Sequence, residues 1–298
     1  MNKRISYNGN PNLKQIGTVI NYTPEQVQEI IKCSRDPIYF IETYCMIVSL
    51  DQGLVHFKLY ECQKEKVDVI LNNRKVILME GRQQGKTITA AACILWYTLF
   101  QESKTVAILA NKSSAAREVL YRYQIMYEAL PLWMQQGVKT FNKGDIELEN
   151  GSRVFTAATS SSGIRGKSVN WLYIDEAAII PNNVAEDFFT SVYPTISAGE
   201  TTKILLTSTP FGYNHFWKFW NDAEQGINGF KSLYIPYSKF QAELKNGLHN
   251  RKHCLVSLNL IKKFYVDSLV HLTRLFLRML SRECLLCLMC LKMKVLML

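Results

Sequence analysis

The stretch GRQQGKT, residues 81–87, has the residue types of a phosphate-binding loop. That loop follows the pattern Gly, any four residues, Gly, Lys and then Ser or Thr. Counting back from Gly85 puts Glu80 where the first glycine belongs, and a glycine stands one place later. In a working loop Lys86 reaches the β and γ phosphates of a nucleotide, and the Thr87 hydroxyl ligates magnesium. Taken alone, the stretch is equally compatible with a helix start that carries an incidental lysine.

Two adjacent carboxylates, Asp175 and Glu176, follow the apolar stretch WLYI and form a second signal. A buried strand that ends in two acids is costly unless the acids have work to do. At a nucleotide site, Asp175 would hold the magnesium shell and Glu176 would polarise the attacking water as a general base. The plainer alternative is two solvated acids at a strand end, and the loop upstream makes it less favoured.

Three hydroxyl side chains end the stretch ILLTSTP and form the third signal: Thr207, Ser208 and Thr209. Hydroxyls at a strand end beside a phosphate site can sense the γ-phosphate and pass its loss onward. Standing alone, they would better fit a polar turn before proline. Together, the three signals predict an ATP-hydrolysing core.

Short apolar strands that alternate with helical stretches must position these residues. The predicted strands are 75–80, 105–110, 171–175 and 203–209, the predicted helices include 86–101 and 113–130, and Asn150-Gly151 turns a hairpin over 145–158. This alternation indicates an α/β fold with a mostly parallel sheet covered by helices on both faces. Ligands bind at the carboxyl ends of the strands in such sheets, and all three signals fall there.

The first 50 residues predict an arm and two helices. The polar residues 1–20 predict a flexible arm. Thr23 is a candidate helix cap, Pro24 fits the first helical position and Gln26 completes a capping box. The stretch DPIYFIETYCMI, residues 36–47, predicts a second helix whose aromatic face belongs to the core.

Composition indicates a folded globular protein, because 48% of the 298 residues are hydrophobic and 20% are charged. The net charge of +10 looks like a nucleic-acid signal until it is located. Residues 251–298 hold nine Lys/Arg against two Asp/Glu, which leaves only +3 for the first 250 residues. The scattered cysteines of the first third suit reduced thiols of a cytosolic protein, and neither a signal peptide nor a membrane span is expected.

These motifs resemble the ATPase domain of the large terminase subunit, the DNA-packaging motor of tailed bacteriophages. The stretches that carry the resemblance are GRQQGKT, YIDEAAII, TSTPFGYNHFWKFW, FKLYECQKE and SSSGIRGKS, and they span about residues 30–238. In that family the phosphate loop commonly departs from the ordinary pattern and carries an Arg just inside it. The misplaced glycine is therefore a trait that the resemblance explains.

The resemblance implies roles for single residues. Arg82 would be a cis arginine finger, Glu176 the catalytic carboxylate and Gln63 the adenine contact. The family often has an aromatic residue just before that Gln, and here Cys62 stands there with Tyr60 close by. Together with the loop pattern, the expected nucleotide-binding residues are Gly81, Gln83, Gln84, Gly85, Lys86, Thr87, Gln63 and Asp175, with Thr87 and Asp175 also on Mg²⁺. Arg165 and Lys167, in SSSGIRGKS, touch phosphate or DNA or else lie in a solvated loop, and the sequence does not choose.

The resemblance also implies partners and a place. The family couples ATP hydrolysis to movement of double-stranded DNA into a procapsid, as a homo-oligomeric ring on the portal protein, with the small terminase subunit as a further partner. The expected place is the host cytoplasm, at the procapsid portal during assembly and not in the mature virion. Two rivals are a helicase-like ATPase, which needs a second sheet domain, and a catalytically silent portal-docking module.

The tail departs from the rest of the chain. Residues 251–298 contain fourteen Leu but no Gly, Pro, Ala, Gln or Trp. The stretch CLLCLMC has Cys-x-x-Cys spacing, but apolar residues fill its gaps, unlike a zinc site. A complete family member carries an acidic nuclease domain, and the tail has only Asp267 and Glu283, so no nuclease activity is expected. We predict a flexible arm at 1–20, an ATPase domain at 21–238 and a frame-shifted tail at 239–298.

Overall fold

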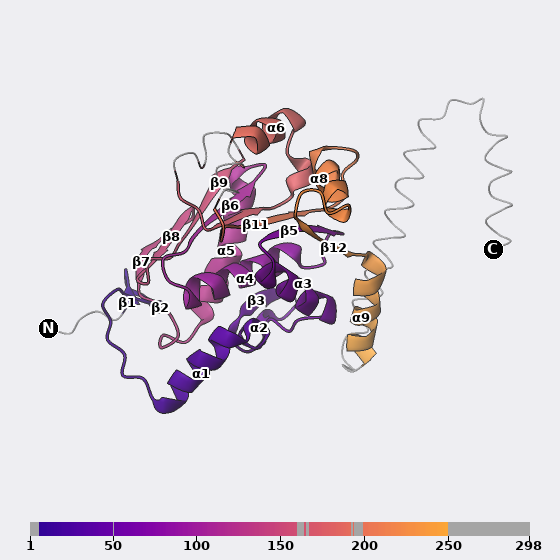
Figure 1. The fold of residues 1–298 in the computed structure, drawn as a ribbon. Helices are drawn as coiled ribbons and strands as arrows, with labels where there is room; N and C mark the ends of the chain where they lie inside the picture. The colour runs from indigo at the N-terminus through magenta and orange to yellow at the C-terminus, as the bar shows by residue number, and fades with distance from the viewer. Residues whose placement is uncertain are drawn as a thin grey trace, which may run out of the picture. The chain divides into compact units, whose positions relative to one another are not determined.

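The computed structural model describes residues 6–49, 51–159, 164, 167–191, 193 and 199–249. Its main feature is an eight-stranded sheet with the order β12-β5-β11-β10-β6-β9-β8-β7 (Figure 1). The strands are β5 (Lys75–Glu80), β6 (Thr105–Ala110), β7 (Val138–Phe141), β8 (Asp145–Leu148), β9 (Arg153–Ala158), β10 (Trp171–Ile174), β11 (Lys203–Ser208) and β12 (Lys231–Ile235). Neighbours from β12 to β9 pair in parallel, and β8 pairs antiparallel with both β9 and β7. The predicted mostly parallel sheet with a hairpin is confirmed.

Helices cover both faces of this sheet. They are α3 (Glu61–Asn72), α4 (Lys86–Phe100), α5 (Ser113–Ala129), α6 (Asn182–Ser191), α8 (His215–Glu224) and the short 3₁₀ helix η1 (Ala177–Ile179). Side chains alternate along the strands, because successive strand residues point to opposite faces. In β10, for example, Trp171 and Tyr173 join the core under α4 and α5, whereas Leu172 and Ile174 join the core under α6 and α8. The near-continuous apolar strands of the sequence are therefore buried on both sides.

The two upstream helices begin where the sequence predicts. Helix α1 (Pro24–Arg35) has Thr23 as its cap, and both hydrogen bonds of the capping box with Gln26 are present. Helix α2 (Pro37–Tyr44) is shorter than predicted, because Met46–Ser49 forms strand β3 and pairs with β4 (Gly53–His56). The prediction of helix through residue 47 was wrong there: the β-branched Ile47 and Val48 gain backbone partners across a hairpin.

The N-terminal segment contains a hairpin, formed by β1 (Ser6–Tyr7) and β2 (Asn10–Lys14). Asn8 and Gly9 make its two-residue turn with φ of +49° and +80°. Leu13 is only 2% exposed, and the Lys14 amide donates to Gln135 Oε1 at 3.0 Å. Residues 6–14 therefore form a hairpin within the segment expected to be a flexible arm, because an Asn-Gly turn favours a hairpin.

The last described element is α9 (Tyr237–His249). The chain divides into two compact units, Met1–Glu243 and Leu244–Leu298. Of the tail predicted to begin at Lys239, residues 239–249 belong to α9, and the remainder lies outside the described residues. Among the helices of the described ranges, none is long and apolar enough to cross a membrane.

Candidate active site

The loop at 81–85 joins the carboxyl end of β5 to the first turn of α4, as the sequence predicts. Its turn needs glycine at Gly85, which has φ of +80° and would place a Cβ 2.5 Å from Gln63 Nε2. Gln83 also takes a left-handed conformation, with φ of +62°. Because α4 begins at Lys86, the unpaired amides of a helix N-terminus face the end of the loop, which suits an anion.

Lys86 and Glu176 meet across the site, although they are far apart in the chain. Lys86 Nζ lies 2.8 Å from Glu176 Oε1. Lys86 is 7% exposed, and the Glu176 side chain is 32% exposed. Glu176 follows β10 in a left-handed conformation, with φ of +51°, and this strained turn aims its carboxylate back at the loop. The predicted phosphate-binding cation and the predicted general base are thus neighbours.

Asp175 joins the loop to the third motif. Its two carboxylate oxygens accept hydrogen bonds from Thr87 Oγ1 at 3.1 Å and from Thr207 Oγ1 at 2.9 Å. Thr207 in turn lies 3.2 Å from the Tyr173 hydroxyl. Strands β5, β11 and β10 are adjacent and parallel, so their carboxyl ends bring these three motifs to one edge. The predicted convergence is therefore observed for Lys86, Thr87, Asp175, Glu176 and Thr207.

The turn that carries Glu176 is held by Ser208, from the predicted third motif, and by two side chains that the sequence reasoning did not single out, Asn214 and His215. Ala178 N donates to Ser208 Oγ at 3.1 Å, and Asn214 Nδ2 donates to the Ala178 carbonyl at 2.8 Å. His215 Nε2 lies 2.8 Å from the Ala177 carbonyl, and since a carbonyl only accepts, this nitrogen donates. Burial lowers the pKa of His215, which favours the neutral ring. The segment after the third motif therefore fixes the backbone beside the candidate base.

The other two hydroxyls of the third motif approach Glu176 only loosely. Ser208 Oγ and Thr209 Oγ1 each lie 3.5 Å from Glu176 Oε2. This distance is at the outer limit for a hydrogen bond, so both contacts are weak. They connect the end of β11 to the carboxylate without fixing it.

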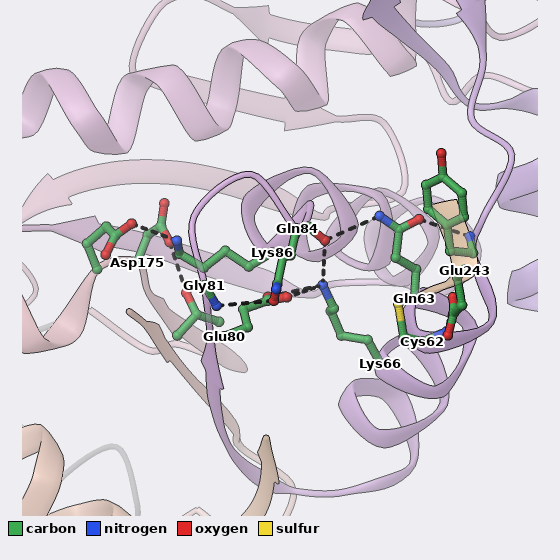
Figure 2. A network of polar contacts seen from close by, with 12 residues as sticks. Cys62, Gln63, Lys66, Glu80, Gly81, Gln84, Lys86, Asp175 and Glu243 are labelled. Carbon is green, nitrogen blue, oxygen red and sulfur yellow. Dashed lines mark hydrogen bonds and ion pairs between the residues drawn. The ribbon is translucent and has the colours of Figure 1, made fainter. Parts of the chain in front are cut away.

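Helix α3 supports the loop from its other side (Figure 2). Gln63 Nε2 donates to the Gln84 carbonyl at 3.3 Å, and Gln63 Oε1 accepts from the Tyr60 amide at 3.1 Å. The side chain predicted to meet adenine thus binds the loop itself. Lys66, one turn further along α3, forms a buried ion pair with Glu80. No sequence signal pointed to this pair.

The remaining predicted residues lie at the margin of these contacts. Arg82 is exposed on the loop, and its role as a finger stays a prediction. Cys62 is buried, and burial raises the pKa of its thiol to about 12, with Glu243 adding to the rise. Lys167 lies over the Phe155 ring, with its ammonium nitrogen 4.1 Å from the ring centroid. Arg165 lies outside the described residues.

Known proteins share this arrangement of strands and helices. The structure is similar to the HK97 bacteriophage large terminase, with a TM-score of 0.58, 18% identity and coverage of 68% of this chain and 43% of that one. It is similar to a mutant of the large terminase ATPase domain of Thermus phage P74-26, with a TM-score of 0.50, 18% identity and coverage of 68% and 91%. The large terminase of another thermophilic bacteriophage, solved in complex with ADP, gives a TM-score of 0.50 at 14% identity, with coverage of 62% and 47%.

These similarities show the fold, and the chain spans less than half the length of the HK97 protein. The family described as terminase large subunit, T4likevirus-type, N-terminal matches residues 77–253, which is more than half of the chain. That match contains the phosphate loop, the acidic pair and the third motif. This chain therefore belongs to the large terminase subunit family, and its described body is the ATPase-type domain of that family.

Proposed function

We propose that this chain hydrolyses ATP to drive double-stranded DNA into a viral procapsid. The observation that carries the proposal is the meeting of Lys86 and Glu176 at 2.8 Å beside the Thr87–Asp175 hydrogen bond at 3.1 Å. A phosphate-binding cation, a general base and two oxygen ligands for a cation stand at the carboxyl edge of a parallel sheet. Membership of the terminase family supports DNA packaging as the use of that chemistry.

The chain's own residues divide the chemistry. Lys86 binds the β and γ phosphates and leaves its ion pair with Glu176 when the nucleotide enters. The freed Glu176 carboxylate then accepts the proton of the attacking water. Arg82, exposed on the loop, adds positive charge to the γ-phosphate as a finger in cis. Each step uses a group that already lies at this edge of the sheet.

Mg²⁺ fits the same site. The described residues hold no group of three or more His, Cys, Asp or Glu that could bind a metal ion by itself. The Thr87 hydroxyl and the Asp175 carboxylate, 3.1 Å apart, are oxygen ligands of the kind that magnesium takes together with phosphates and water. Magnesium would neutralise charge on the phosphates, and Thr87 and Asp175 would hold it.

Thr207, Ser208 and Thr209 would report the state of the phosphates to the rest of the domain. Thr207 contacts Asp175, and the other two contact Glu176. We infer that a homo-oligomeric ring of such chains, seated on the portal protein in the host cytoplasm and with the small terminase subunit as a further partner, converts this signal into movement of DNA. The family match supports this wider setting.

The test is ATP turnover by the full chain with magnesium, measured alone, with double-stranded DNA and with single-stranded DNA. We expect turnover that double-stranded DNA stimulates. Stimulation by single-stranded DNA alone would favour a helicase-like ATPase. Nucleotide binding without turnover, even with procapsids that carry the portal, would favour a silent docking module.

The start of the aberrant tail is bounded by contacts between α9 and α3. Lys239 Nζ lies 2.6 Å from Glu65 Oε2, and the Glu243 carboxylate accepts from the Cys62 amide at 3.1 Å. These contacts with α3 support assigning residues to the native domain as far as Glu243, and the unusual composition begins after residue 250. We therefore propose a change of reading frame downstream of Glu243. Stop codons that interrupt both alternative frames of the coding DNA between codons 251 and 275 would contradict it.

A further inference from the structure

The ion pair between Lys66 and Glu80 is fully enclosed. Lys66 Nζ lies 2.7 Å from Glu80 Oε2 and 3.0 Å from Oε1, and both side chains are 0% exposed (Figure 2). Removing two charges from water is expensive, and their attraction repays that cost only in good geometry. Glu80 is the last residue of β5, at the position where the ordinary loop pattern has its first glycine. A buried charge pair thus stands where other loops have no side chain.

Lys66 also holds the loop directly. Its ammonium group donates a third hydrogen bond, at 3.3 Å, to the Gln84 carbonyl, the same oxygen that Gln63 Nε2 reaches at 3.3 Å. A lysine has three donors, so these contacts use all of them. Residues three apart lie on one helix face, which is why Gln63 and Lys66 converge on one oxygen. Helix α3 therefore fixes the loop at residue 84 with two donors.

The side chain of Gln84 spans the loop above this pair. Its Oε1 accepts from the Gly81 amide at 3.1 Å, and Gln84 is only 1% exposed. A Cβ at Gly81 would lie 3.3 Å from Gln84 Nε2, so the fit is tight. The loop's shape thus depends on side chains from beneath it as well as on its glycines.

The sign of the charges also matters. Glu80 lies directly before a loop that would hold a polyanion, so an unpaired carboxylate here would repel the phosphates. Burial raises the pKa of Glu80, and the neighbouring Lys66 ammonium opposes that rise. Lys66 therefore balances a negative charge that the site could not otherwise tolerate.

We propose that Lys66 and Glu80 are positioning residues that replace the first glycine of the phosphate loop and hold the loop in its phosphate-binding shape. The inference rests on the proposed nucleotide site. It predicts that the pair acts on the phosphate half of a nucleotide, because its contacts reach residues 80–84 and not the opposite side of the site.

The experiment compares full-chain variants by their affinity for ATP and for AMP, with nucleotide-free thermal unfolding as a second readout. Lys66→Met should weaken ATP binding at least about tenfold and reduce the preference for ATP over AMP, since it removes a charge-assisted hydrogen bond to the loop. Glu80→Gln keeps the shape of the side chain and should show a smaller loss of the same kind. The matched control is Lys64→Met, on the same helix α3, which removes a partly exposed ion pair with Glu61 at 2.9 Å.

A double variant, Lys66→Met with Glu80→Leu, separates an effect on the loop from an effect on folding. It removes both charges and fills the same space with apolar side chains, which usually preserves stability. We expect it to fold and still lose the preference for ATP. The proposal is overturned if this variant binds ATP and AMP as the unaltered chain does. It is also overturned if the double variant fails to fold, because the pair would then serve the fold and not the loop.

The two proposals fail in different ways. If the unaltered chain does not bind ATP, the proposed function is wrong. Hydrogen exchange of the amides at 81–86 still tests the pair in that case. Faster exchange in Lys66→Met than in Lys64→Met would support its hold on the loop, and equal exchange would overturn it.

Discussion

The two sides of the phosphate loop differ in how closely their charges are enclosed. On the α3 side, the Lys66–Glu80 pair is 0% exposed and uses every donor of the lysine. On the β10 side, the Glu176 side chain is 32% exposed; it pairs with Lys86 at 2.8 Å but meets Ser208 and Thr209 only at 3.5 Å. Contacts that are partly exposed and long exchange readily for contacts with a ligand or water, whereas a buried pair cannot open without leaving a charge unpaired.

This difference suggests different roles for the buried Lys66–Glu80 pair and for the partly exposed contacts of Glu176. On the proposed function, we expect the α3 side to keep the loop's shape while the β10 side rearranges when phosphates enter or leave. The backbone just after Glu176 is fixed, because hydrogen bonds with Ser208, Asn214 and His215 hold residues 177 and 178. A candidate base on a fixed backbone, whose partly exposed carboxylate can exchange its Lys86 contact for water, is suited to a repeated cycle.

The largest expected effect comes from removing Lys86, the cation of the loop that pairs with Glu176. Lys86→Ala should lower kcat/KM for ATP by roughly 10³-fold or more, because the phosphates lose their main positive partner. Steady-state phosphate release measures this. Lys139→Ala, which removes an exposed ion pair with Glu147 at 3.3 Å, is the control and should leave turnover unchanged. Turnover of Lys86→Ala near that of the unaltered chain would remove the phosphate-loop assignment.

The next effect isolates the β10 side. Glu176→Gln should bind ATP with nearly unchanged affinity while kcat falls by about 10²–10⁴-fold, because the amide keeps the shape and loses the base. Affinity and single-turnover rate should be measured on the same preparation. Glu147→Gln serves as the control on a distant strand. A variant that loses binding yet hydrolyses what it binds at the normal rate would contradict the role given to Glu176.

A moderate effect is expected from the hydrogen bond between Asn214 and the backbone that follows Glu176. Asn214→Asp keeps the oxygen that caps α8 by accepting from Trp217 N, but it loses the amide that donates to the Ala178 and Phe211 carbonyls. We expect kcat to fall about tenfold, as for loss of one hydrogen bond, with ATP affinity retained. Asn214→Ala, which also loses the cap of α8, should be less stable as well. Equal turnover in Asn214→Asp and the unaltered chain would show that the turn needs no such support.

The smallest effect is a pH dependence of stability. Burial lowers the pKa of His215 in the folded chain below its ordinary value of about 6.5. As pH falls through that value, the unfolded chain takes up the proton more readily than the folded one, so stability falls. Above it the ring is neutral in both states and contributes no slope. Urea unfolding of His215→Gln should lose less stability than the unaltered chain between about pH 7.5 and 5.5, on either side of that ordinary value, and parallel curves would reject this assignment.

The sequence predicted the β10 side of the site better than the α3 side. Asp175 and Glu176 are adjacent in the chain and follow an apolar strand, so the sequence alone shows them as one acidic motif. Lys66 and Glu80 stand on a helix and a strand, and their pairing depends on how α3 packs against β5. No local period or motif encodes that packing, so the contact needs the tertiary structure. Asn214 and His215 were missed for the same reason.

Two other differences had a signal in the sequence. Asn8-Gly9 is a hairpin dipeptide, and its presence outweighs the polar composition that suggested a flexible arm. The β-branched Ile47 and Val48 favour a strand, and the aromatic stripe before them does not carry the helix onward. In both places, local turn and strand chemistry predicted more than composition or helical periodicity did.

The enclosed pair at Lys66 and Glu80 also limits how this sequence can diverge. A single substitution at either position leaves an unpaired charge in the buried interior, so sequences that keep only one of the two charged residues should be rare. The two positions should therefore change in step across related chains. A relative with glycine in place of Glu80 is expected to carry an uncharged residue in place of Lys66, so that the inherited loop returns to the ordinary pattern through a paired replacement.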